Sequence, residues 1–373
     1  MSLSCLKFIK IKKTCYTRPF SPRLENTIFA MSKSELLQFS KNEDIRILEY
    51  IESLSDSDTL LNAYKNLSDS NLSIGRRYLI KAWFERHGAL FYSLSILKNF
   101  YWIKYIGKGS FSTVHLLQDS NSHEENVKVI KISPNVKLKS ENITRFYREI
   151  EILKAIKHPN IITLFEYGID CDYSWYLTDY SNLGSVDNYL VAVKSNSVCN
   201  TSYFRYQMIR NIISALHFIH KMNIIHRDVK SANIFVSGES YDDENVVFKL
   251  GDFNLSRFLE NDNSSKLSYC GTRQFMAPEI INGDIYTNKV DMWSFLCVII
   301  HITILKTMNP IIISTDALCG MLEKELSEIE LHIVKMLHHV NHIDRANSNE
   351  MKVFIEDNFT EYISEKRQRV KSF

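Results

Sequence analysis

The sequence predicts an α+β fold in which a small β-rich lobe is followed by a larger helical lobe, with a cleft between the two. Two observations support this prediction. Short aromatic and β-branched runs separated by turns begin near residue 100 and are typical of strands. From about residue 205 onward, segments whose apolar residues recur with the period of a helix dominate the chain.

The expected β-rich lobe begins with a β-hairpin. Its strands are the runs Tyr101–Ile106 and Val114–Leu117, which a glycine-containing turn connects. The remaining predicted elements are strands at Val127–Ile132, Ile161–Tyr167 and Trp175–Tyr180, a helix at Glu141–Lys157 between the first two of these, and later helices at Arg205–Lys221, Asn288–Leu305 and Leu326–His339.

The first 99 residues differ in character from the rest. Residues 1–33 are basic and lack the apolar stretch of a secretory signal, so we expect a disordered tail; a targeting arm, or a start at Met31, stays open. Residues 34–99 have helical spacing but no chemical motif, which predicts a helical extension that packs on the chain or binds a partner. Residues 360–373 are expected to form a C-terminal tail, which leaves residues 100–359 as the main domain.

The overall composition excludes several function classes. The 45 basic and 43 acidic residues nearly cancel, giving a net charge of +2 and no reason to expect nucleic-acid binding. The seven cysteines are scattered and form no C-x-x-C pair, which favours a reducing compartment, the cytoplasm, with the nucleus not excluded. The longest apolar run, Phe295–Leu305, is too short to span a bilayer, so no membrane span is expected.

Two glycines lie in the turn of the predicted hairpin. The run reads Ile106-Gly107-Lys108-Gly109-Ser110-Phe111-Ser112-Thr113-Val114. Glycine lets backbone N–H groups approach phosphate oxygens without interference from a Cβ atom. Many hairpins contain two glycines, so this run alone is weak support for a nucleotide site. It does not open a helix, which disfavours a dinucleotide-binding turn.

A second motif follows the helix that ends near Lys221. The run reads His226-Arg227-Asp228-Val229-Lys230-Ser231-Ala232-Asn233. Asp228 can accept a proton from an attacking hydroxyl, Lys230 can neutralise charge on a transferring phosphoryl group, and Asn233 can hold a magnesium ion. Further along the chain, Asp252 ends a predicted strand and is suited to bridging metal and phosphates. Four reactive groups in this order are hard to explain as solvated turns.

Together, these motifs resemble those of the eukaryotic protein kinase family, from Phe100 to about Phe359. The resemblance implies a bilobal α+β fold and transfer of the γ-phosphate of ATP, with Mg²⁺, to hydroxyl groups of protein substrates. Lys230 and Thr272 together resemble the serine/threonine branch, which makes tyrosine specificity the minority alternative. The segment Ala277-Pro278-Glu279 resembles the part that docks peptide chains, which disfavours a small-molecule kinase that shares the fold.

The resemblance also implies an ATP site. Its phosphate loop is the run Ile106–Val114, in which Ser112 replaces the third glycine that the family usually has. The hinge is similar to residues 177–181, with Thr178 at the back of the nucleotide pocket and the backbone of Asp179 and Ser181 beside the adenine.

Glu149 resembles the glutamate that pairs with the ATP-contacting lysine of the family. Either Lys131 or Lys128 can be that lysine. Lys131 is preferred because Val129, two residues earlier, then lies on the same side of the strand and faces the adenine. Lys128 would place Asn126 there, which is a poorer surface for a base.

Several later residues resemble positions that control the family's activity. The regulatory apolar column corresponds to Leu153, Leu164, His226 and Phe253, anchored by Asp291. Glu279 is expected to pair with Arg345. Asn254 replaces the glycine of the family's D-F-G motif. We expect the backbone conformation of the motif to be retained, because asparagine tolerates positive φ better than other non-glycine residues.

Ser268 lies three residues before Gly271, where many members of the family are phosphorylated. A phosphate there could pair with Arg227 and Arg257 and order the loop; an unmodified polar loop is the alternative.

The alternative function is a pseudokinase that acts as a nucleotide-binding scaffold or regulator. The departures at Ser112 and Asn254 favour it, whereas the retained Asp228, Asn233 and Asp252 favour an active enzyme.

Overall fold

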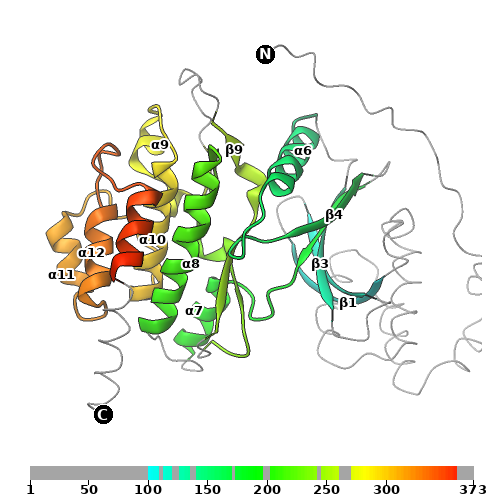
Figure 1. The fold of residues 1–373 in the computed structure, drawn as a ribbon, viewed down its shortest axis with the longest axis horizontal. Helices are drawn as coiled ribbons and strands as arrows, with labels where there is room; N and C mark the ends of the chain where they lie inside the picture. Colours follow the sequence, from blue (N-terminus) through cyan, green and yellow to red (C-terminus); the bar gives the residue numbers. More distant parts are fainter. Residues whose placement is uncertain are drawn as a thin grey trace, which may run out of the picture. The chain divides into compact units, whose positions relative to one another are not determined.

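The computed structural model describes residues 100–108, 112–119, 126–134, 140–169, 173–195, 202–241, 245–259 and 270–358 (Figure 1). The expected tail and extension before residue 100, the tail at 360–373, and Gly109, Ser110, Phe111 and Ser268 lie outside these residues. The chain divides into two compact units, which are described separately. One comprises residues 1–133 and 169–173, and the other comprises residues 134–168 and 174–373.

The first unit contains an antiparallel meander of three strands, β1 (Phe100–Lys108), β2 (Thr113–Asp119) and β3 (Val127–Pro134). The predicted hairpin and third strand are therefore confirmed. On one face of β2 and β3, the side chains of His115, Leu117, Ile130 and Ile132 are buried. Because side chains alternate along a strand, Val114, Val129 and Lys131 lie on the opposite face.

The second unit begins with α6 (Ser140–Ala155), β4 (Leu164–Ile169) and β5 (Tyr173–Asp179), close to the predicted helix and strands. Its long helices are α8 (Ser202–Lys221), α10 (Lys289–Ile304) and α12 (Glu328–Leu337), which confirm the three helices predicted for this part. The helices α7 (Val186–Lys194), α9 (Pro278–Asn282) and α11 (Thr315–Leu322) were not predicted.

Short elements between α8 and α10 position the loops of the site. They are β6 (Ile224–Ile225), η4 (Ser231–Asn233), β7 (Ile234–Ser237), β8 (Val247–Leu250), η5 (Phe253–Leu255), β9 (Arg257–Phe258) and η6 (Arg273–Phe275), where η denotes a turn of 3₁₀-helix. Strand β6 pairs with β9, and β7 pairs with β8, both antiparallel. The chain is helical again at 348–358.

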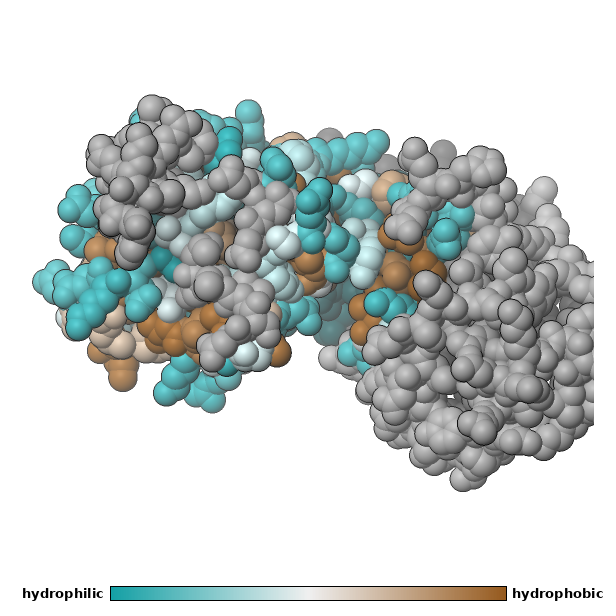
Figure 2. All heavy atoms as spheres, turned by 90° about the horizontal axis from the view of Figure 1, so that it is seen from below, coloured by the Kyte–Doolittle hydropathy of each residue, from teal (hydrophilic) through white to brown (hydrophobic). Residues whose placement is uncertain are grey.

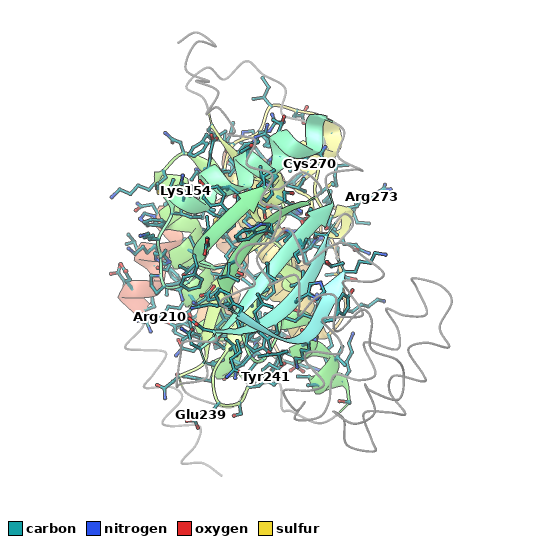
Figure 3. The ribbon with its side chains drawn as sticks, turned by 90° about the vertical axis from the view of Figure 1, so that its right-hand side faces the viewer. Lys154, Arg210, Glu239, Tyr241, Cys270 and Arg273 are labelled. Atoms are coloured by element: carbon teal, nitrogen blue, oxygen red, sulfur yellow. The ribbon has the colours of Figure 1, made fainter. Side chains whose placement is uncertain are left out.

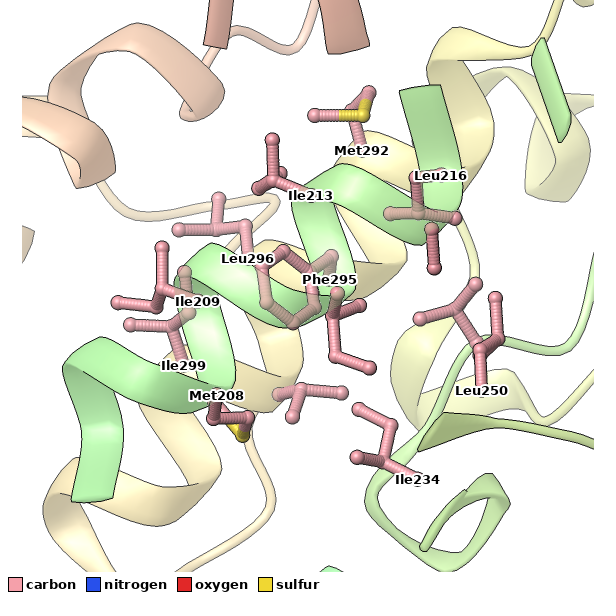
Figure 4. Close-up of a cluster of buried hydrophobic side chains, with 14 of the residues drawn as sticks. Met208, Ile209, Ile213, Leu216, Ile234, Leu250, Met292, Phe295, Leu296 and Ile299 are labelled. Atoms are coloured by element: carbon pink, nitrogen blue, oxygen red, sulfur yellow. The ribbon is translucent and has the colours of Figure 1, made fainter. Parts of the chain in front are cut away.

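The core of the second unit forms around α10. This helix is apolar on all sides, and such helices are buried in the centre of a domain. Its side chains Phe295, Leu296 and Ile299 pack beside Ile209 and Ile213 of α8 (Figure 4). The α+β prediction is thus confirmed, and the helical core provides a rigid support for the loops that follow β6 and β8.

In the space-filling view, hydrophilic side chains are interspersed with smaller hydrophobic areas over the described surface (Figure 2). Among the described helices, none has both the length and the apolar character needed to cross a bilayer.

Candidate functional site

The loop that follows β6 is fixed from below by a buried carboxylate. Asp291, in the first turn of α10, accepts the backbone N–H of His226 at 2.9 Å and that of Arg227 at 2.8 Å. A third contact joins Asp291 to Nε2 of His220, at 2.9 Å. Burial alone would raise the pKa of Asp291, but the hydrogen bonds and charges of His220 and His226 outweigh it, and the pKa is lowered. The ionised carboxylate therefore holds this loop in place.

Asp228 is the centre of the loop and is almost completely buried. Its Oδ1 accepts a hydrogen bond from Oγ1 of Thr272 at 2.9 Å, and its Oδ2 accepts one from Nζ of Lys230 at 2.7 Å. Lys230 also donates to Oγ1 of Thr272, at 3.0 Å. The three side chains thus form a closed ring of hydrogen bonds that orients one carboxylate.

Asn233 contacts the same carboxylate. Its Nδ2 donates to the backbone oxygen of Asp228 at 2.9 Å and to Oδ2 of Asp228 at 3.1 Å. Because a carboxylate can only accept, these contacts fix which end of the amide is nitrogen, and Oδ1 of Asn233 must point elsewhere. That oxygen is the atom that Asn233 can offer to a cation.

Pairing of β7 with β8 brings Asp252 to Asn233. Ile234 pairs with Leu250, and the backbone N–H of Gly251 donates to the backbone oxygen of Asn233 at 2.9 Å. Asp252 follows directly in a left-handed conformation, with φ of 61°. Oxygen ligands from a carboxylate and an amide are those that Mg²⁺ prefers, so the residues present fit this ion.

The positive φ on which the expectation for Asn254 rested is not found. The positive φ in this motif belongs to Asp252, whereas Asn254 lies inside η5 and is not among the residues with positive φ. Its Nδ2 lies 3.5 Å from Oδ2 of Asp252, and its Oδ1 is buried without a hydrogen-bond partner among the described residues. Position 254 therefore does not need glycine for its backbone.

Part of the predicted apolar column is in contact. His226 packs edge-on against Phe253, with ring centroids 4.7 Å apart, and one ring nitrogen lies 3.1 Å from the carbonyl oxygen of Gly251. Leu153 and Phe253 are buried in the same core, against which Leu164 packs.

Helix α6 carries Glu149 into the interior. The hydroxyl of Tyr176 on β5 donates to its Oε1 at 2.7 Å, and the glutamate is 4% exposed. Sequence reasoning identified Glu149 but missed Tyr176, because tyrosine in a strand is usually a core residue.

In the first unit, Lys131 of β3 pairs directly with Val114 of β2, which in turn pairs with Gly107 of β1. Residues opposite each other share a face, so Gly107, Val114, Val129 and Lys131 lie together. Lys128 pairs with Leu117 on the other face, which also carries the buried His115 and Ile130. In the same strands, Ile106 and Lys108 are exposed and Thr113 is half-buried, and Ser112, just before β2, is buried.

The predicted hinge belongs to the second unit. Thr178 and Ser181 are both buried. The carboxylate of Asp179 accepts the backbone N–H of Thr163 at 2.9 Å and forms an ion pair with Lys249 of β8. These contacts, which the sequence did not reveal, hold the predicted hinge segment through the Asp179 side chain.

The segment after Thr272 is anchored to the helical core. Arg345 donates to both carboxylate oxygens of Glu279, at 2.7 and 3.1 Å, which confirms the predicted pair. Its guanidinium also lies over the ring of Trp293, 4.9 Å from the centroid.

Three arginines from separate elements lie close together in the second unit. Burial lowers the pKa of Arg148 on α6, and the charges of Arg257, Arg227 and Arg145 lower it further. Nε of Arg257 is buried without a hydrogen-bond partner among the described residues. Arg227 donates to the backbone oxygen of Leu255 and to the hydroxyl of Tyr286. Sequence reasoning named Arg227 and Arg257 but did not include Arg148 in this cluster.

Comparison with known proteins adds an independent finding. The family model for the protein kinase domain matches residues 100–370. A probable myosin light chain kinase of Dictyostelium discoideum is 33% identical over 192 residues, which cover 51% of this chain and 46% of the relative. Calcium-dependent protein kinase 4 of Plasmodium falciparum is 33% identical over 193 residues, 52% of this chain and 35% of the relative.

Human serine/threonine-protein kinase ULK1 is 32% identical over 192 residues, 51% of this chain and 18% of the relative. The chain thus spans less than half the length of each of these curated relatives.

Proposed function

The chain belongs to the protein kinase family and has its α+β fold, and from this premise we propose that it is a serine/threonine kinase that uses ATP to phosphorylate proteins. The observation that supports this best is the ring formed by Asp228, Lys230 and Thr272. A carboxylate whose two oxygens are both held by hydrogen bonds is suited to orienting the hydroxyl group of a substrate.

In the proposed reaction, Asp228 orients the acceptor hydroxyl and accepts its proton as the new O–P bond forms, while the bond from the γ-phosphorus to the bridging oxygen breaks and ADP leaves. Lys230 places a positive charge beside the same carboxylate, where negative charge on the transferring group needs compensation. Oδ1 of Asn233 and the carboxylate of Asp252 would hold Mg²⁺, which supplies charge neutralisation on the phosphates when it is bound.

Each unit holds residues that we propose to contact ATP. In the first, the shared face of Gly107, Val114, Val129 and Lys131 supports Lys131 as the ATP-contacting lysine. In the second, backbone groups of Asp179 and Ser181 would contact the adenine beside Thr178.

Phosphate incorporation from radiolabelled ATP tests this proposal. The wild-type chain is expected to phosphorylate itself or generic protein substrates in a Mg²⁺-dependent way. Asp228→Asn keeps the shape of the side chain and is expected to lower the rate by at least about 10²-fold, the usual size of an acid–base contribution. ATP binding, followed with a fluorescent analogue, is expected to persist in this variant.

A wild-type chain that binds ATP but transfers no phosphate would instead support the pseudokinase alternative, a nucleotide-binding scaffold.

For Ser268, we propose that phosphorylation orders the loop through the cluster of Arg148, Arg227 and Arg257. Three guanidinium groups that influence one another's charge, one with a buried Nε that has no hydrogen-bond partner among the described residues, suit a doubly charged phosphate. Mass spectrometry of the active protein is expected to find phosphate at Ser268, and Ser268→Ala to lower activity. Unchanged activity together with unmodified Ser268 would contradict the proposal.

A further inference from the structure

The turn that follows Thr272 lies immediately beside the catalytic carboxylate. Oγ1 of Thr272 is 2.9 Å from Oδ1 of Asp228, and the next three residues, Arg273–Phe275, form η6. A substrate whose hydroxyl reaches Asp228 must therefore run past this turn.

The backbone of the turn is rigidly held. Oγ of Ser294 on α10 donates to the carbonyl oxygen of Phe275 at 2.7 Å, and Nδ2 of Asn309 donates to that of Met276 at 2.8 Å. The ring of Phe275 is buried. A side chain that leaves this turn toward solvent therefore starts from a fixed position.

Arg273 is such a side chain. It is exposed, as is its neighbour Gln274. In Figure 3 it lies on the side of the view opposite to Arg210 of α8, which is also exposed. Within the part of the chain that the structure describes, Arg273 forms no ion pair.

Apart from the buried Arg227, the other charges of the two loops around Asp228 are paired. In residues 228–233, Asp228 and Lys230 pair with each other. In residues 271–280, Glu279 is buried and pairs with Arg345. Arg273 is therefore the exposed charge in these two loops that has no ion-pair partner among the described residues, and both loops lie in the second unit.

We propose that Arg273 makes the enzyme select substrates with an acidic side chain near the phosphorylated serine or threonine. This inference rests on the proposed kinase activity. An extended peptide advances at most about 3.6 Å per residue, and Thr272 touches the carboxylate that receives the hydroxyl. The acidic substrate side chain that contacts Arg273 is thus expected within about three residues of the acceptor serine or threonine.

A peptide series tests the proposal on the full-length chain. Each peptide contains one serine and carries Glu, Gln or Lys at one of the three positions on either side of it. At one or more positions, kcat/KM for the Glu peptide is expected to exceed that for the Gln peptide about two- to fivefold, which is typical of an exposed ion pair. The preference is expected to shrink at high salt.

Charge reversal provides the decisive comparison. Arg273→Glu is expected to favour Lys over Glu at the same position, and Arg273→Gln to lose the preference. Two controls, Gln274→Ala in the same turn and Arg210→Gln on α8, are expected to keep the wild-type preference. A structural role of Arg273 would lower all rates together without inverting the order of the peptides.

The outcomes separate this inference from the proposed function. Phosphorylation of peptides without a charge preference, or a preference that Arg273→Glu leaves unchanged, overturns the role of Arg273 alone. Absence of phosphate transfer to every peptide and protein overturns both proposals.

Discussion

At the scale of single residues, one hydroxyl group links the catalytic loop to the turn beside it. Oγ1 of Thr272 donates to Asp228 and accepts from Lys230, so both partners depend on it. Serine and threonine supply this hydroxyl, whereas valine has the shape of threonine without it.

Replacement of Thr272 by Val is therefore expected to lower kcat about tenfold or more, since a buried partner loses its hydrogen bond at a cost of about 1–3 kcal/mol. Thr272→Ser keeps the hydroxyl and is expected to stay within about threefold of wild type. Steady-state kinetics with a protein substrate measures both variants. Wild-type kcat in Thr272→Val would show that the ring around Asp228 does not matter for the rate.

Asn254 carries a buried polar atom that no described residue satisfies. Its Oδ1 has no hydrogen-bond partner among the described residues, and its Nδ2 is only 3.5 Å from Asp252. Since an unsatisfied buried carbonyl is costly, Asn254→Ala is expected to raise the free energy of unfolding by about 1 kcal/mol. Chemical denaturation measures this change.

The matched variant is Asn254→Asp, which keeps the shape but places a second carboxylate beside Asp252. Nδ2 of Asn254 lies 3.5 Å from Oδ2 of Asp252, and two carboxylates this close repel each other. The free energy of unfolding of the variant is therefore expected to be lower than that of wild type at pH 7. A stability equal to that of wild type would mean that position 254 does not face Asp252 in solution.

At the scale of elements, α10 organises the second unit. Asp291 in its first turn holds the backbone of the catalytic loop, and Ser294, one turn later, holds the turn that carries Phe275. A helix that is apolar on all sides is fixed by packing, so polar groups on it can act as anchors with little freedom to move.

The short helix α9 depends on a buried ion pair. Glu279 and Arg345 are both buried, with 4% and 0% of their side chains exposed. Removal of one partner leaves the other charge buried and unpaired, so Glu279→Ala is expected to lower the free energy of unfolding by about 3–5 kcal/mol. Urea denaturation measures the loss.

The exposed pair Lys352–Glu356, which the chain forms at 3.7 Å, is the control. Lys352→Ala is expected to cost no more than about 0.5 kcal/mol, because solvent screens this pair. Similar losses in the two variants would argue against a special role for the buried pair.

At the scale of the whole molecule, buried histidines make stability depend on pH. Burial lowers the pKa of His115 in the first unit to about 4, and burial also lowers the pKa of His226 in the second. In His226, one ring nitrogen faces the carbonyl oxygen of Gly251 and the other faces the backbone N–H of Asp228, which suits only the neutral ring.

Below pH 6.5 the unfolded chain binds protons that these folded histidines do not, so stability is expected to fall as the pH drops from 7 to 5. His115 alone should contribute about 2 kcal/mol over this range. Urea unfolding at several pH values measures the slope. His115→Phe removes this titration and is expected to reduce the loss by that amount; an unchanged slope would rule out His115 as the cause.

Much of this molecule follows from local patterns in the sequence. Hydrophobic periodicity located α8, α10 and α12, and the hairpin of β1 and β2 followed from its strand residues and glycines. The order of Asp228, Lys230, Asn233 and Asp252 indicated phosphoryl transfer, because these reactive types at short spacing rarely occur together by chance. Such features depend on neighbours in the chain, which a sequence displays directly.

Only the tertiary structure decided which distant groups meet. The pairing of Lys249 with Asp179, of Tyr176 with Glu149, and of His220 with Asp291 joins residues far apart in the sequence, where any of several partners would have been compatible with the pattern. The same applies to Asn254, which lies in a turn of 3₁₀-helix and does not have the positive φ that was assumed. Contacts of this kind depend on how packed elements place side chains in space, and a linear pattern of residue types does not contain that information.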